Sequence, residues 1–314
     1  MARKLNLKVF LYGLLLSGLP LWTAAQTEQE EPEDNHPMPE SVTQVVGTGK
    51  PASFNKVNYD FFKLSAGLKL SSFRDFATSP LYYSGVPKSY AASFCRLNSK
   101  KEIETEASYT AGNYKNNYND QLSVSAVKTV SVYHSRLYTI KRWSNDNWNL
   151  KAGAMYLISA NFRINTGLGN AAAGYEAVSS LMGSFKASRD ISRTRSKSGK
   201  LLFIKYTANP RKRELGMRFN AGLGNQSLRN GYSYLGQAAL LNESGLKGFF
   251  SGYNIYTGGL HFNTAIDYTV WTKNNNAWQI SYIWDSYRTG GSYERFEMSG
   301  HMIRFSFIFH TNNK

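Results

Sequence analysis

The stretch that ends the chain, "SGHMIRFSFIFHTNNK", restricts the fold more than any other part of the sequence. Polar Arg304, Ser306 and His310 alternate there with large apolar side chains. Because successive side chains of a β-strand point to opposite faces, this pattern predicts a strand with one apolar and one polar face. Few residues follow that could cover the apolar face, so we expect lipid to be its solvent. The apolar positions are Ile303, Phe305, Phe307 and Phe309.

The same alternation recurs along the chain. "LHFNTAIDYTVW" (260–271) and "AWQISYIWDSY" (277–287) both alternate, and the short polar "TKNNN" between them predicts a hairpin. "KLSAGLKL" (63–70) and "LGMRFNAGL" (215–223) repeat the pattern. No convincing helical period is present, and 14% aromatic residues with 26 Gly suit strands and turns.

The alternating runs favour a membrane barrel over a soluble β-sandwich, in which the apolar face would be the core. Several runs exceed ten residues and carry aromatic side chains toward their ends, as membrane strands do. The expected fold class is all-β: a transmembrane, antiparallel, up-and-down β-barrel of about 12 strands, within a range of roughly 10–14. The runs lie at 61–73, 89–98, 102–112, 121–141, 148–164, 175–188, 200–208, 215–224, 247–256, 260–271, 277–288 and 299–310.

The beginning of the chain predicts export. Residues 1–25 have the layout of a secretory signal peptide, with a basic start, an apolar stretch and small residues before cleavage after Ala25. Residues 26–55 form an acidic, proline-rich leader that we expect to be disordered, with an optional edge strand, and residues 56–314 form the barrel. The predicted location is the outer membrane. The expected partners are outer-membrane lipids and, during biogenesis, the barrel-assembly machinery.

The strand count also predicts which loops are external. With both chain ends on the periplasmic side, the segment 225–248 falls on that side too, where turns are normally short. Either it folds into the lumen or the strand count between 200 and 250 is wrong. The predicted external loops are 74–88, 113–120, 165–174, 209–214 and 288–297.

Alternation assigns side chains to the two faces of the wall. The candidates for lining the lumen are Lys63, Lys69, Arg218, Asn263, Asp267, Gln279, Asp285 and Arg304. The candidates for facing lipid are Leu64, Leu68, Phe219, Tyr268, Trp278, Trp284, Phe305, Phe307 and Phe309.

The sequence contains no recognisable catalytic constellation, metal site or cofactor motif. His134 and Ser135 are adjacent, so they point to opposite faces of a strand, and the five histidines lack the close spacings of a metal site. The single Cys95 excludes an intrachain disulfide. The net charge of +16 includes basic runs at 193–200 and 211–213, for which contact with anionic lipid or a solvated turn are the alternatives. We expect no nucleic-acid partner, because no binding fold is indicated.

The "SPLYYSG" element after the first strand and the closing run, which contains "GLKGFFSGYNIYTGGLHFN" and "SGHMIRFSFIFH", resemble an uncharacterised family of predicted Gram-negative outer-membrane β-barrels. That resemblance implies location and fold but no activity. From the charged lumen we expect a narrow, porin-like channel for small polar solutes, biased toward anions. The alternatives are a non-conducting structural or partner-binding barrel and, less favoured, a lipid-modifying hydrolase.

Overall fold

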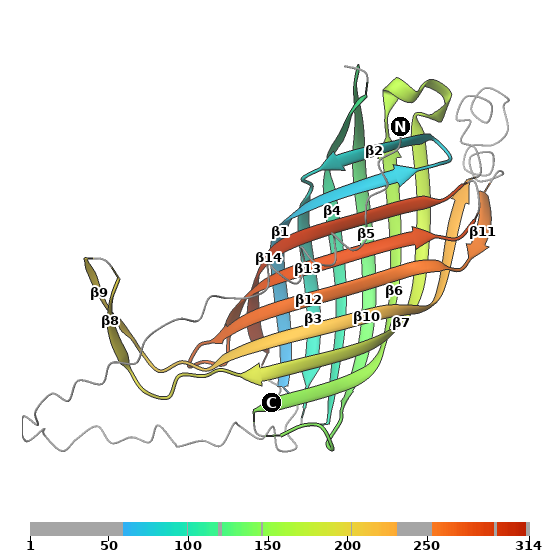
Figure 1. The fold of residues 1–314 in the computed structure, drawn as a ribbon. Helices are drawn as coiled ribbons and strands as arrows, with labels where there is room; N and C mark the ends of the chain where they lie inside the picture. The colour runs from blue at the N-terminus through green and yellow to red at the C-terminus, as the bar shows by residue number, and fades with distance from the viewer. Residues whose placement is uncertain are drawn as a thin grey trace, which may run out of the picture. The chain divides into compact units, whose positions relative to one another are not determined.

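The computed structural model describes residues 59–311 except 99, 119–120, 146, 202, 231–252 and 292–293. The predicted signal peptide (1–25) and leader (26–55) lie outside the described residues. The described chain forms an antiparallel β-sheet that closes on itself as a barrel (Figure 1). Its helical content is the 3₁₀ turn η1 (Thr166–Ala171), and none of the described helices is long and apolar enough to cross a membrane.

The barrel wall consists of ten strands. Two of them are each built from two consecutive pieces: β2 continues as β3, and β11 continues as β12. The second break falls at Gly258 and Gly259, whose φ angles of 92° and 93° favour glycine. The pieces are β1 (Tyr59–Asp75), β2 (Ser79–Gly85), β3 (Lys88–Leu97), β4 (Lys101–Tyr118), β5 (Gln121–Thr139), β6 (Trp148–Ile164), β7 (Ala173–Asp190), β10 (Arg213–Asn230), β11 (Tyr253–Thr257), β12 (Gly259–Trp271), β13 (Ala277–Thr289) and β14 (Phe296–Thr311).

Pairing of the first strand with the last closes the barrel. β1 and β14 are antiparallel neighbours from Asp60–Thr311 to Asp75–Phe296, so the apolar terminal strand has partners on both edges. Closure leaves no free edge in the wall, which satisfies the backbone groups as a lipid environment requires. Within the described chain, the short strands β8 (Lys197–Leu201) and β9 (Ile204–Ala208) pair only with each other and form a separate hairpin between β7 and β10.

Ten strands fall within the expected range of roughly 10–14, and the two surplus runs have clear origins. The predicted run at 200–208 belongs to the β8–β9 hairpin outside the wall. The run at 247–256 overlaps β11, which is the first part of a crossing that β12 completes. Both are strands, but neither is a separate crossing of the wall.

The structure changes several of the predicted loops, and residues 79–85 of the predicted loop 74–88 form β2 in the wall. We call the rim that contains Tyr59 and Thr311 the terminal rim and the opposite one the loop rim. Residues 209–214 precede β10 at the terminal rim, so their assignment to an external loop was wrong. For 225–248, the second of the two alternatives holds: the strand count between 200 and 250 was wrong, because β10 ends at Asn230 and β11 begins at Tyr253, both at the loop rim.

The outside of the wall is apolar and the inside is polar. On β14, Phe307 is 53% exposed whereas the neighbouring Ser306 is 0% exposed. Of the side chains predicted to face lipid, Leu64, Leu68, Phe219, Phe305, Phe307 and Phe309 are exposed on the outer face, and Tyr268, Trp278 and Trp284 are half-buried there. An exterior of large apolar side chains around a polar interior is the reverse of a soluble protein and suits a bilayer.

Candidate functional site in the barrel interior

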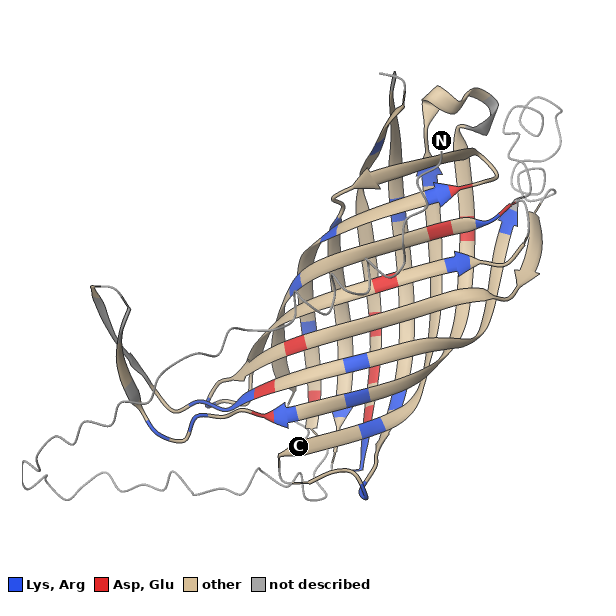
Figure 2. Cartoon of the chain, in the orientation of Figure 1, with Lys and Arg blue, Asp and Glu red and all other residues tan. Residues whose placement is uncertain are grey.

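Three glutamates of β4 form the centre of the barrel interior. Glu102, Glu104 and Glu106 alternate with outward residues, so all three carboxylates point inward, and each residue is at most 5% exposed. Figure 2 shows the positions of Lys, Arg, Asp and Glu along several strands of the wall. Burying three negative charges on one strand is strongly unfavourable unless cations from other strands pair with them.

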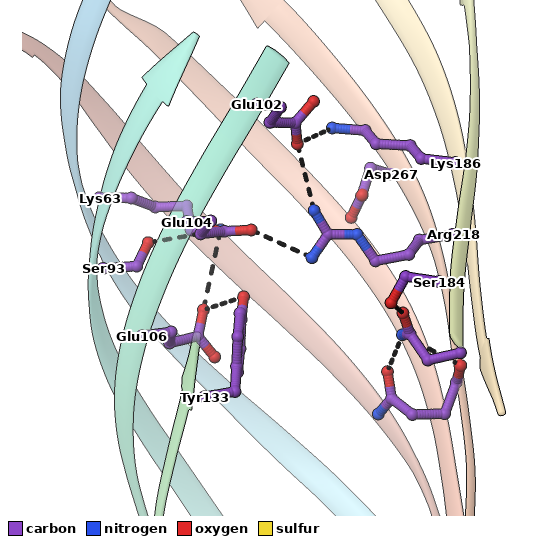
Figure 3. Close-up of polar contacts among 12 residues, drawn as sticks. Lys63, Ser93, Glu102, Glu104, Glu106, Tyr133, Ser184, Lys186, Arg218 and Asp267 are labelled. Carbon is purple, nitrogen blue, oxygen red and sulfur yellow. Dashed lines mark hydrogen bonds and ion pairs between the residues drawn. The ribbon is translucent and has the colours of Figure 1, made fainter. Parts of the chain in front are cut away.

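Cations from five strands reach these carboxylates, and Figure 3 shows three of them, Lys63, Lys186 and Arg218. Arg218 of β10 donates to both Glu102 and Glu104 at 3.1 Å. Since β4 and β10 lie on opposite sides of the barrel, this guanidinium crosses the lumen. The other contacts are Lys151 Nζ and Lys186 Nζ to Glu102 at 2.6 Å, Lys63 Nζ to Glu104 at 2.6 Å, and Arg304 to Glu106 at 2.7 Å.

A second layer, nearer the loop rim, also spans the lumen. Asp75 of β1 accepts hydrogen bonds from Arg163 of β6 and Arg229 of β10, both at 2.6 Å. Glu176 of β7 lies 3.5 and 3.6 Å from the same two guanidinium groups. The Arg163 guanidinium stacks over the ring of Phe296 at 4.3 Å. We call these five residues the closing layer.

Three more aromatic side chains pack in one cluster with Phe296 of the closing layer. Phe73 stacks on Tyr83 with ring centroids 5.2 Å apart and on Phe296 at 5.7 Å. Tyr114 meets Phe73 edge-on, and each of these four rings is at most 4% exposed. Because the rings come from β1, β2, β4 and β14 and touch the arginines of β6 and β10, side chains from opposite walls fill this cross-section.

Between these layers lies a hydrogen-bonded chain around a buried histidine. Ser180 Oγ lies 2.9 Å from His261 Nδ1, and His261 Nε2 lies 3.1 Å from Asp285 Oδ1. Lys69 Nζ is 3.7 Å from the other oxygen of Asp285. The three residue types resemble a hydrolase triad, but Ser180 is 0% exposed and does not line the cavity described next. A nucleophile must be able to reach its substrate, and the buried Ser180 hydroxyl is not presented to the central cavity.

A cavity of about 260 Å³ occupies the middle of the barrel. All eight residues that the sequence predicts for the lumen line it: Lys63, Lys69, Arg218, Asn263, Asp267, Gln279, Asp285 and Arg304. Six Lys and Arg residues and six Asp and Glu residues take part in the lining. The expected excess of positive charge is therefore absent from the lining, because the glutamates of β4 and β10 were not counted in the sequence prediction.

The β4 glutamates are the interior residues that the sequence analysis did not single out. The signal was present in "KEIETEASYT", where Glu102, Glu104 and Glu106 recur with period two. The apolar contrast of this stretch is weak, because of the two outward residues between the glutamates, Ile103 and Thr105, only Ile103 is apolar. Among the described residues, no group of three or more His, Cys, Asp or Glu side chains is placed to hold a metal ion.

No protein-family model and no curated protein matches the chain. Among solved structures, it is similar to the outer membrane protease OmpT from Escherichia coli, with 7% identity, a TM-score of 0.48, and coverage of 82% of this chain and 100% of that one. It is also similar to the translocator domain of the autotransporter NalP from Neisseria meningitidis, with 9% identity, a TM-score of 0.37, and coverage of 82% and 90%. The P. putida toluene transporter TodX shares 6% identity, a TM-score of 0.30, and coverage of 85% and 94%. These likenesses bring no activity to this chain.

Proposed function

We propose that the protein is an integral outer-membrane β-barrel whose interior is closed to free diffusion, so that its role is structural or partner-binding. The observation that carries this proposal is the closing layer. Arg229, Glu176 and Phe296 are each 0% exposed inside the barrel. A water-filled pore would leave such groups wet, whereas here the cross-section is filled by paired charges and aromatic rings.

A narrow channel is the second candidate, and the central cavity favours it. Its 260 Å³ is far more than the roughly 10–15 Å³ that one water molecule needs, so the cavity has room for several waters. The lining contains as many positive as negative side chains. It therefore suits small polar solutes rather than selective passage of anions or of cations. For solutes to pass, the closing layer would have to move aside.

The proposed setting includes three features predicted from the sequence. Outer-membrane lipids would surround the apolar outer face, the barrel-assembly machinery would insert the chain, and cleavage after Ala25 would release the mature protein. The proposal includes no catalysis, and the burial of Ser180 away from the central cavity supports this part of it. Release of fatty acid from phospholipid vesicles by the folded protein would contradict this last point.

Two measurements test the proposal. Alkaline carbonate extraction of membranes should leave the protein in the pellet, and its release into the soluble fraction would refute membrane insertion. Single-channel recording in planar bilayers should show no steady conductance for the wild-type barrel. Sustained conductance steps of the wild-type protein would refute the closed interior and support the channel.

A variant designed to open the closing layer provides a positive comparison for the conductance measurement. Arg229→Ala combined with Phe296→Ala removes an arginine and a ring from the filled cross-section, so we expect conductance to appear. Leu223→Ala is the control, because Leu223 lies on the same strand as Arg229 but is 75% exposed. Heat-modifiable migration in gels verifies that each variant has folded.

A further inference from the structure

The outer surface of β3, β4 and β5 carries a row of two lysines with a small residue between them. Lys88 is the register partner of Ala111, and Ala111 is the register partner of Lys128. Neighbouring strands are about 4.8 Å apart, so the two lysine Cα atoms are roughly 10 Å apart across Ala111. We call these three residues the lysine row. Both lysines are exposed, and the alanine leaves the space between their long stems open.

The lysine row borders the lipid-facing surface. One step from the lysine row toward the terminal rim, Tyr90 and Tyr109 are register partners, and they are 53% and 41% exposed. Farther toward that rim the outer face carries apolar residues such as Phe94 and Val132. Tyrosine rings at this level are typical of a membrane interface. One step toward the loop rim, β4 presents Asn113 in place of an apolar side chain.

These lysines differ from the lysines inside the barrel. Lys63, Lys151 and Lys186 each lie 2.6 Å from a glutamate oxygen. Lys88 and Lys128 form no ion pair with any described residue, and the outward positions of the described parts of β2 to β6 contain no Asp or Glu. An unpaired lysine on a lipid-facing surface is tolerated near the interface but unfavourable deeper in the bilayer, so an anionic partner would stabilise this arrangement.

We propose that the lysine row, with the tyrosine hydroxyls below it and Asn113 above it, binds the phosphate of a phosphorylated glycolipid in the surrounding leaflet. A lipid phosphate fits better than free phosphate because apolar surface continues from the lysine row toward the terminal rim, where Val130 is 52% and Phe94 is 44% exposed. An amphiphile contacts such a surface with its apolar portions while its phosphate meets the ammonium groups. This inference rests on the proposed membrane insertion.

The test uses the full chain folded in non-ionic detergent, with bisphosphorylated lipid A as the probe and fully dephosphorylated lipid A as its comparison. Native mass spectrometry measures the dissociation constants. We expect Lys88→Gln with Lys128→Gln to weaken binding of the phosphorylated probe by about 30-fold, roughly fivefold for each lysine. Lys273→Gln is the matched control, because Lys273 is an exposed lysine in the turn at the terminal rim, and its binding should equal that of the wild type.

Two results would overturn the inference. One is binding of the phosphorylated probe by the double variant within about twofold of the wild type. The other is equal binding of the phosphorylated and dephosphorylated probes by the wild type. Heat-modifiable migration shows whether each variant is folded before binding is measured. Failure of membrane insertion is detected separately by carbonate extraction, so the two proposals fail on different readouts.

Discussion

Replacing Glu104 with Gln tests whether the buried ion pairs hold the barrel together. Glu104 accepts a hydrogen bond from Lys63 at 2.6 Å and one from Arg218 at 3.1 Å. The Lys63 and Glu104 side chains are only 11% and 7% exposed, so solvent screens this pair little. Removing one partner of a buried pair costs roughly 3–5 kcal/mol, because the remaining charge is left uncompensated.

The expected cost lies near the lower end of that range, at about 3 kcal/mol. Lys63 keeps Glu106 at 3.7 Å, and Arg218 keeps Glu102 at 3.1 Å, so neither cation loses every partner. Urea unfolding of the barrel in phospholipid vesicles, followed by tryptophan fluorescence, measures the change in free energy of unfolding.

A double-mutant cycle separates the pair from other effects of the substitution. Glu104→Gln combined with Lys63→Gln should cost less than the two single changes together, with a coupling of about 1–3 kcal/mol. Ser93→Ala is a control, because its 3.4 Å hydrogen bond to the same carboxylate should contribute at most about 1 kcal/mol. If Glu104→Gln changed stability by less than about 0.5 kcal/mol and showed no coupling, the pairing argument would be refuted.

Two further predictions concern the wall itself. Phe307→Arg should cost roughly 2–4 kcal/mol in urea unfolding if that outward side chain meets the bilayer midplane, and a cost near zero would contradict its assignment to lipid. Gly153→Ala should prevent or strongly weaken folding, because a Cβ there would collide with the backbone carbonyl of Arg136 on the neighbouring strand. Gly224→Ala is the control: its Cβ meets nothing within 4 Å, so its free energy of unfolding should stay within about 0.5 kcal/mol of the wild type. Equal heat-modifiable folding of the two glycine variants would show that the β5–β6 contact is looser than described.

The faces of the wall were predictable where alternation is strict. In β12, β13 and β14 every predicted lumen residue lines the cavity, because large apolar side chains dominate one face of each strand and the charged and amide side chains lie on the other. Alternation of apolar and polar residues is a property of one strand alone, so it can be recognised without knowing which strands pair with it.

The number of crossings and the pairing of charges depend on information that local patterns do not contain. The strands at 200–208 and 253–257 have ordinary strand sequences, and only their pairing shows that neither crosses the wall alone. Glu104 and Arg218 are 114 residues apart, and they meet only because closure brings β4 opposite β10. Their contact was therefore inaccessible to a reading of single strands.

Closure between β1 and β14 is the central claim, because it fixes which side chains face each other across the lumen. Ser65 and Ser306 are register partners, and their hydroxyl oxygens lie 2.8 Å apart inside the barrel. In a chain with Cys95→Ser, cysteines at both serine positions should form a disulfide on mild oxidation in native membranes, seen as a mobility shift without reductant. The pair Ser65→Cys with Phe305→Cys should not cross-link, since those side chains point to opposite faces. Absence of the first cross-link, or equal formation of both, would contradict the closed barrel in this register.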